Sequence, residues 1–177
     1  MLDPVLVRPH RPPMERKACF PPVADDEIRI LILGSLPGEE SLRRGQYYGH
    51  PQNRFWELVG TAIGTPLRPL PYADRLQVLL RHRIGLWDVI AHAARAGSLD
   101  SAIRDAAPND LSALVTSLPK LRAVAFNGRK AGQEGRKLLA GAASDVALID
   151  LPSSSPAYAA MPLAEKKERW AAIADHL

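Results

Sequence analysis

One short apolar segment, residues 28–33, constrains the fold of this chain more than any other feature. Its sequence, IRILIL, is rich in β-branched residues and is almost wholly apolar. That pattern predicts a strand buried on both faces, as in parallel sheets, because a half-exposed strand would alternate apolar and polar residues. Gly34, Ser35, Pro37 and Gly38 follow at once. Ligands of parallel α/β sheets bind beyond the carboxyl ends of the strands, so we expect a binding site here.

Strands and helices alternate along the rest of the chain. Further strands are predicted at residues 84–90, 121–126 and 146–151. Helices are predicted over residues 53–63 and 72–82, from Asp110, over residues 129–140 and from Pro162 to the carboxyl terminus. This alternation predicts an α/β fold, a three-layer α/β/α sandwich with a central parallel sheet of about four strands.

Length, charge and cysteine content narrow the class of protein. A chain of 177 residues is typical of one domain. The net charge of +4 and the sequence pI near 9.5 suit a polyanionic partner. A single cysteine, Cys19, excludes an internal disulfide and any four-cysteine zinc or iron–sulfur site. No apolar run is long enough for a membrane span or a signal peptide. We therefore expect a cytoplasmic protein that needs no metal and no cofactor.

The first 24 residues differ in composition from the rest. They hold six of the sixteen prolines together with Arg8, Arg11, Arg16 and Lys17. Proline disfavours both helices and central strands, so we predict a basic leader without regular structure, followed by a single domain over residues 25–177. The leader is either loosely docked or in contact with a phosphate backbone.

Four segments should converge at the carboxyl edge of the predicted sheet. They are residues 34–53, the stretch after Ile90, residues 127–130 and residues 152–158. Their side chains are mostly neutral hydrogen-bonding groups and aromatics, with cations at the margins: Arg43, Arg44, Arg129 and Lys130. Aromatic faces stack on bases, amides read base edges and hydroxyls donate to phosphates. A nucleotide therefore fits the expected site.

Each of these groups also has a purely structural interpretation. Tyr47 and Tyr48 can roof the core with their rings. Asn53 can cap the helix that follows it. The run Ser153–Ser155 can be a simple turn between two prolines. Rival chemistries lack their motifs, since the chain has no dinucleotide fingerprint, no phosphate loop, no Gly-x-Ser-x-Gly elbow and no helical histidine pair.

The ordered motifs of the chain resemble the uracil-DNA glycosylase superfamily, most closely its hypoxanthine-DNA (deoxyinosine) glycosylase branch. The most specific stretch is the first motif, GSLPG at residues 34–38 with Ser41, QYYGHP at residues 46–51, Asn53 and Phe55-Trp56. Later matches are GLWDV at residues 85–89, GSLD at residues 97–100, FNG at residues 126–128 and LPSSSP at residues 151–156. The resemblance extends over about residues 28–160.

The resemblance implies an enzyme that flips a deaminated base, hypoxanthine above all, out of double-stranded DNA and hydrolyses its glycosidic bond to leave an abasic site. It implies that Asn53 orients the attacking water. Tyr48 would stack on the flipped base in a pocket that also contains Gly34, Ser35, Leu36 and Asn127. The serine loop, Ser153, Ser154 and Ser155, would bind DNA phosphates, and the basic balance of the chain adds Arg129 and Lys130 to the expected DNA-binding residues. We expect the enzyme to act as a monomer.

Two positions depart from the commoner branches. Leu36 stands where other branches have a water-activating Asp or Asn, and Leu151 stands where the commonest branch has a histidine that stabilises the departing base. Both departures are consistent with the hypoxanthine branch. They also leave two alternatives, a mismatch-type uracil-DNA glycosylase and a non-catalytic module that binds lesion DNA.

Overall fold

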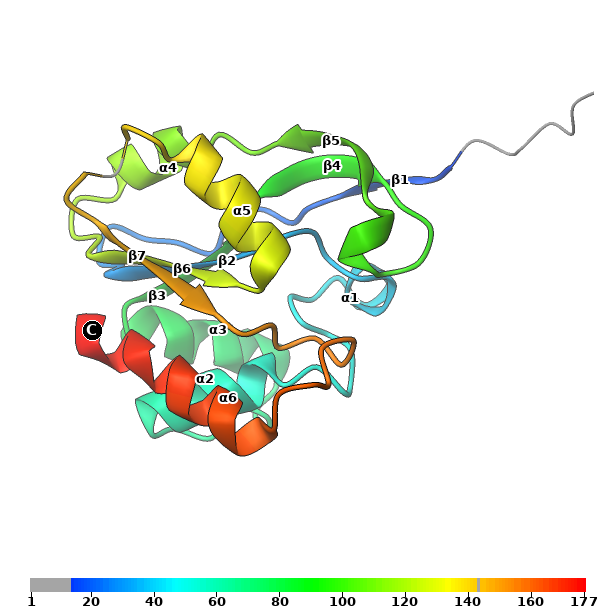
Figure 1. Cartoon of the computed structure of the whole chain (residues 1–177). Coiled ribbons are helices and arrows are strands. Elements are labelled where there is room, and N and C mark those ends of the chain that lie inside the picture. Colours follow the sequence, from blue (N-terminus) through cyan, green and yellow to red (C-terminus); the bar gives the residue numbers. More distant parts are fainter. Residues whose placement is uncertain (1–13, 143) are drawn as a thin grey trace, which may run out of the picture.

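A four-stranded parallel sheet forms the centre of the protein, here described from a computed structural model that covers residues 14–142 and 144–177 (Figure 1). The strands lie in the order β3-β2-β6-β7. Their bounds are β2, Ile30–Gly34; β3, Ile84–Asp88; β6, Ala123–Asn127; and β7, Ala147–Leu151. The predicted parallel sheet of four strands is confirmed, with strand bounds that shift by a few residues at most.

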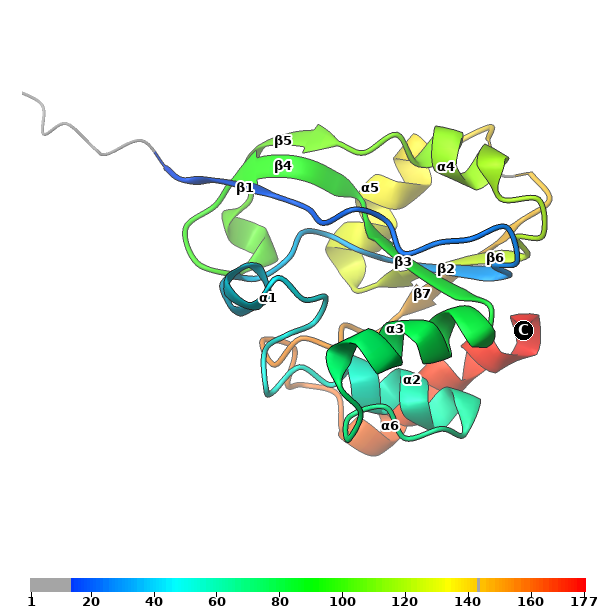
Figure 2. The ribbon, with the colours of Figure 1, turned by 180° about the vertical axis from the view of Figure 1, so that it is seen from behind.

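Helices cover both faces of this sheet, as the views from the front and from behind show (Figures 1 and 2). On one face lie α4, Leu111–Ser117, and α5, Arg129–Leu138. On the other lie α2, Phe55–Ile63; α3, Tyr72–Arg81; and α6, Leu163–Trp170, which continues into the 3-10 helix η2, Ala171–His176. The predicted α/β/α sandwich is therefore confirmed.

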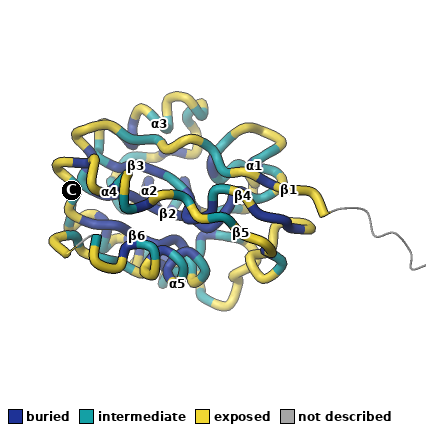
Figure 3. Tube along the Cα trace, turned by 90° about the horizontal axis from the view of Figure 1, so that it is seen from above, coloured by how far each residue is buried: buried dark blue, intermediate teal, exposed yellow. Residues whose placement is uncertain are grey.

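Strand β2 shows why both faces must be covered. Its residues Ile30 and Ile32 are fully buried in the cluster formed with α2, α3 and α6. The alternate residues Leu31 and Leu33 are equally buried in the cluster formed with α4 and α5. Side chains of a strand point alternately to opposite faces, so a run that is apolar throughout needs a helical layer on each side. The buried centre and the exposed periphery are visible in Figure 3.

A second, antiparallel sheet lies beside the first and was not predicted. It consists of β1, Arg16–Ala18; β4, Ile90–Ala94; and β5, Arg104–Pro108, in the order β1-β4-β5. The predicted strand over residues 84–90 ends at Asp88, and β4 begins at Ile90 in the other sheet. The prediction that the leader lacks regular structure is wrong at Arg16–Ala18, because pairing with β4 supplies the backbone hydrogen bonds. Arg8 and Arg11 lie outside the described residues.

Two short helical segments were also not predicted. Helix α1, Glu39–Arg44, carries acidic residues in its first turn and basic residues in its last, which complements the helix dipole, and it ends at Gly45 with φ 64°. The 3-10 helix η1 spans Asp100–Ala102. Neither is long enough to produce a clear periodic pattern. Among the described residues, no helix has the length and apolarity required to cross a membrane.

Candidate functional site

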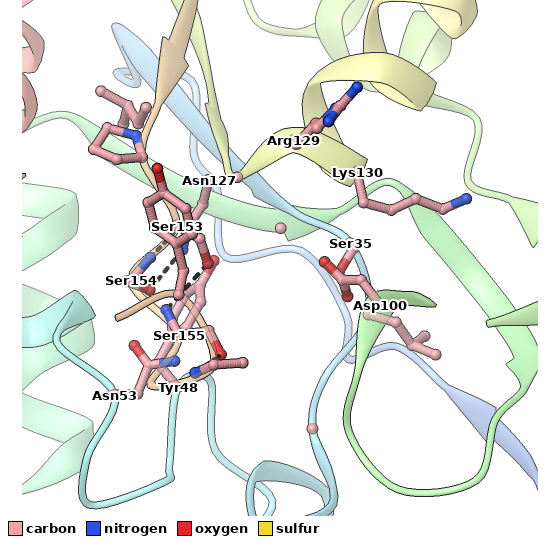
Figure 4. A pocket seen from close by; sticks show the side chains of 18 of the residues that line it. Ser35, Tyr48, Asn53, Asp100, Asn127, Arg129, Lys130, Ser153, Ser154 and Ser155 are labelled. Carbon is pink, nitrogen blue, oxygen red and sulfur yellow. Dashed lines mark hydrogen bonds between the residues drawn. The ribbon is translucent and has the colours of Figure 1, made fainter. Parts of the chain in front are cut away.

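A cavity of about 870 Å³ opens at the carboxyl edge of the parallel sheet. Its walls come from the segments that follow β2, β6 and β7, together with the end of β3 and the segment around η1. Every predicted base-pocket, catalytic and DNA-binding residue lines this cavity, whereas the expected marginal cations Arg43 and Arg44 do not. Figure 4 shows Asn53, Tyr48 and the loop of Ser153–Ser155 on one side, with Ser35 and Asp100 across the opening. The parallel topology therefore brings the predicted residues together, as expected.

Asn127 and Ser154 fasten the serine loop to the sheet. Asn127 Nδ2 donates to Ser154 Oγ, and the Ser154 backbone N–H donates to Asn127 Oδ1, both at 2.9 Å. The Ser154 carbonyl in turn accepts the backbone N–H of Arg54 at 3.0 Å. Both side chains are at least nine-tenths buried. These bonds hold the end of β6, the serine loop and the start of α2 in one fixed arrangement.

The serine loop differs in part from what was expected of it. Ser154, predicted to bind DNA, is 1% exposed and its hydroxyl points inward to Asn127, so it is placed to shape the loop and not to contact a phosphate. Ser153 Oγ accepts the Ser155 N–H, and Ser155 Oγ accepts the Ala157 N–H, each at 3.2 Å. These are the local bonds of a serine-rich turn, and both hydroxyls remain partly exposed at the cavity.

Asn53 is half-buried just before α2. Its Oδ1 accepts the backbone N–H of Phe55 at 2.9 Å, so the side chain satisfies an otherwise unpaired donor at the helix start. The capping residue itself is Arg54, one position later than predicted. A carbonyl oxygen has two lone pairs, so the bond to Phe55 fixes the amide and leaves Oδ1 able to accept from a water molecule.

The two adjacent tyrosines have different surroundings. Tyr47 is 4% exposed and donates its hydroxyl hydrogen to the Pro21 carbonyl at 2.7 Å, so it roofs the core as in its structural interpretation. Tyr48 has φ 53° and stacks its ring on Phe55, with centroids 3.8 Å apart and planes 13° apart. Burial and the nearby Asp88 raise the pKa of Tyr48 above its ordinary value, so its hydroxyl stays neutral.

The segment after β2 supplies both polar and apolar wall. Ser35 Oγ donates to Asp100 Oδ1 at 2.6 Å and joins this segment to η1. Leu36 is 6% exposed and packs in a small cluster with Ile90 and Ile103. The two departures noted in the sequence, Leu36 and Leu151, are thus buried apolar wall.

Two acidic wall residues, Asp88 and Asp100, were not predicted as site residues from the sequence. Asp88 ends β3 and is 4% exposed. Burial raises the pKa of Asp88 to about 7, and the charge of Asp100 adds to the shift. Asp88 could have been identified from the sequence as an acidic residue at the carboxyl end of a buried strand, because ligands bind at such strand ends and acidic groups in ligand sites often have perturbed pKa values.

The positive rim of the cavity is formed at the start of α5. Arg129 is exposed and Lys130 is half-buried, with Lys130 Nζ 3.7 Å from Glu134 Oε1 along the helix. Figure 4 shows both side chains extending from the first turn of α5. Arg43 and Arg44, expected at the margin, instead pair with Glu40 on α1 and do not line the cavity.

Comparisons with known proteins show what this chain is similar to. The family model of the uracil DNA glycosylase superfamily matches residues 21–175. A protein of Methanosarcina acetivorans named hypoxanthine DNA glycosylase is 48% identical over 160 residues, which are 90% of this chain and 99% of that protein. A protein of the same name from Methanosarcina barkeri is 49% identical over 118 residues, 67% of this chain and 75% of that protein.

A solved structure shares the fold. The solution NMR structure of a candidate uracil DNA glycosylase from Methanosarcina acetivorans superposes with a TM-score of 0.81 at 46% sequence identity. The match covers 92% of this chain and 98% of that one. Both sheets and the cavity described above fall within residues matched by the family model, apart from β1.

Proposed function

The chain belongs to the uracil-DNA glycosylase superfamily, and from this premise we propose that it is a DNA glycosylase that removes hypoxanthine from double-stranded DNA and leaves an abasic site. The observation that carries the proposal is the convergence of Asn53, Tyr48 and Asn127 on one cavity beside the positive start of α5. A cavity of about 870 Å³ is within the usual range for ligand sites and has room for a flipped nucleoside.

The reaction begins when the damaged nucleotide leaves the base stack, at a cost of a few kcal/mol that is smallest for mispaired bases. The bond from C1′ of the sugar to the base nitrogen then breaks, and its electron pair goes to the base. Water supplies a hydroxyl to C1′ and a proton to the base. Asn53, held by its bond to Phe55, orients that water through Oδ1, since an amide is a poor general base but a good acceptor.

Other wall residues give the site its shape. The Tyr48 ring, backed by Phe55, forms a flat aromatic wall for stacking on the base. The side chains of Leu36 and Leu151 offer no hydrogen bonds, whereas the Asn127 amide, although bonded to Ser154, keeps one N–H and one oxygen lone pair for the base. The partly exposed hydroxyls of Ser153 and Ser155 and the cations Arg129 and Lys130 are available for phosphates on the rim. One chain supplies the whole cavity, and we infer that the monomer is active.

A base-release assay tests the proposal. Duplexes that carry one hypoxanthine, one uracil or one xanthine are incubated with the protein, and free base and alkali-labile sites are both quantified. We expect release of hypoxanthine in excess of the other two bases. Release of uracil alone would identify the protein as a mismatch-type uracil enzyme. Binding of lesion duplexes without any base release would identify it as a non-catalytic module.

A further inference from the structure

Asp88 is a buried carboxyl in the cavity wall for which the proposed reaction gives no use. It ends β3 and is the register partner of Gly34 on β2. Only 4% of the residue is exposed, and its Oδ2 atom has no hydrogen-bond partner among the described residues. Burying an unpaired carboxylate is strongly unfavourable, so such a group stays protonated to a higher pH than usual.

Gly34 leaves the space that this carboxyl occupies. A Cβ atom at Gly34 would be 2.7 Å from Asp88 Oδ1 and 3.0 Å from Tyr48 Oη. Both polar atoms therefore pack against the same glycine, which only a residue without a side chain permits. The carboxyl is thus placed beside the aromatic wall on which the base is proposed to stack.

The titratable groups around Asp88 come from four parts of the fold. Two of these groups act on Asp88 through their charge. Asp100 in η1 raises the pKa of Asp88, and Arg95, just after β4, lowers it. The charge of Asp88 in turn acts on three neutral groups: Tyr47 and Tyr48, between α1 and α2, and Cys19, after β1. Burial, with Asp88 adding to it, raises the pKa of all three, so they are neutral near pH 7. Burial raises the pKa of Asp88 itself to about 7.

We propose that Asp88 sets the upper pH limit of base release, because its neutral form is compatible with the negative charge that gathers on the departing base and its carboxylate form repels it. The inference rests on the proposed function. In a site that excludes water, a like charge a few ångströms away is far less screened than in solution. Asp88 therefore acts on the departing base through its own charge state and donates no proton in this scheme.

The pH dependence of single-turnover base release from a hypoxanthine duplex tests the inference. For the wild-type protein the rate should fall about tenfold for each pH unit above the Asp88 pKa. Asp88→Asn removes the ionisation but keeps the shape, so its profile should be flat between about pH 6 and pH 9, whatever its absolute rate. Asp150→Asn is the matched control, because Asp150 is an exposed carboxylate of the same cavity paired with Arg136, and it should keep the wild-type fall.

Thermal melting gives a readout independent of turnover. The folded protein keeps the Asp88 proton to about pH 7, whereas the unfolded chain releases it near the ordinary value of 3.8. Stability should therefore fall as pH rises between these values and level off above pH 7, relative to Asp88→Asn. Parallel rate profiles for wild type and Asp88→Asn, a folded variant that releases no base at any pH, or equal melting slopes would each overturn the inference. Absence of base release by the wild type at pH 6 would instead reject the proposed function.

Discussion

Asn53 combines a structural contact with a proposed chemical one in a single oxygen atom. The bond from Phe55 N–H to Asn53 Oδ1 stabilises the start of α2, and the same atom is proposed to orient water. The two interpretations raised by the sequence are therefore compatible. A purely structural role predicts that substitution of Asn53 lowers stability alone, whereas the proposed chemical role predicts that it also lowers the rate of base release.

Asn53→Ala should lower the rate of base release by about 10²- to 10³-fold, as is typical when one preorganised polar group is removed from an active site. Removal of the hydrogen bond to Phe55 should cost about 1 kcal/mol, or about 2–4 °C in melting temperature for a chain of this size. Rates are measured well below the melting transition so that the folded fraction does not limit them.

Asp110→Ala is the matched control for this substitution. Asp110 Oδ1 accepts the Ala113 N–H at 3.0 Å at the start of α4, and Asp110 does not line the cavity. The control should lose similar stability and keep its rate. If both variants lose rate to the same small extent, Asn53 serves only to start its helix.

At the scale of elements, two buried cations connect the small sheet to the cavity rim. Lys17 on β1 donates to the Gly97 carbonyl at 2.7 Å and to Glu39 Oε1 on α1 at 2.8 Å. Arg95 donates to the same Gly97 carbonyl at 3.0 Å and also to the Pro37 carbonyl. The segment after β4 and the segment after β2 are thus held together by groups that lie outside the cavity.

Lys17→Met should destabilise the protein by about 1–3 kcal/mol, because two partly buried hydrogen bonds from the charged amine are removed. The Glu39 side chain is 60% exposed and can be solvated, so loss of the ion pair should contribute little of this cost. Hydrogen exchange of the amides in residues 95–100 should accelerate.

Arg16→Met, the neighbouring change on the same strand, is the control. Arg16 is exposed, and its substitution should change stability by less than about 0.5 kcal/mol. Unchanged exchange at residues 95–100 in Lys17→Met would show that β1 does not restrain the rim.

At the scale of the whole molecule, the effect of the net charge of +4 on DNA binding depends on where the basic side chains lie. Arg129 and Lys130 lie on the cavity rim at the start of α5, where the backbone N–H groups also favour anions. Arg81 and Arg122 are exposed but precede β3 and β6, at the opposite end of the parallel sheet.

Neutralising Arg129 and Lys130 together, as Arg129→Gln and Lys130→Gln, should weaken binding to damaged and undamaged duplexes alike. The slope of log affinity against log salt should become shallower by about 2, because each phosphate that is no longer neutralised reduces it by about 0.9. Preference for the lesion should survive, because phosphates carry no direct base information. Binding titrations over a range of salt concentrations measure both quantities.

Arg81→Gln with Arg122→Gln removes the same charge from the far end of the sheet and should leave the slope nearly unchanged. Equal effects of the two double variants would mean that net charge, and not the rim, governs binding.

The sequence by itself determined the main sheet and the place of the site. Runs such as residues 28–33, 121–126 and 146–151 are apolar at nearly every position, which favours strands covered on both faces. Parallel strands end at one edge, which is why Asn53 and Asn127, far apart in the chain, could be assigned to one cavity.

Tertiary structure alone decided which polar groups face each other. The inward turn of Ser154 and the burial of Lys17 in β1 depend on contacts that are far away in sequence. The same holds for Asp88 Oδ2, which is buried without a hydrogen-bond partner in the part of the chain that the structure describes. Asp88 owes its raised pKa to burial and to Asp100, and the absent side chain of Gly34 leaves room for its carboxyl. Hydrophobic periodicity reports which face of an element is buried. It carries no information about the distance between two polar atoms on different elements, and that distance sets the chemistry.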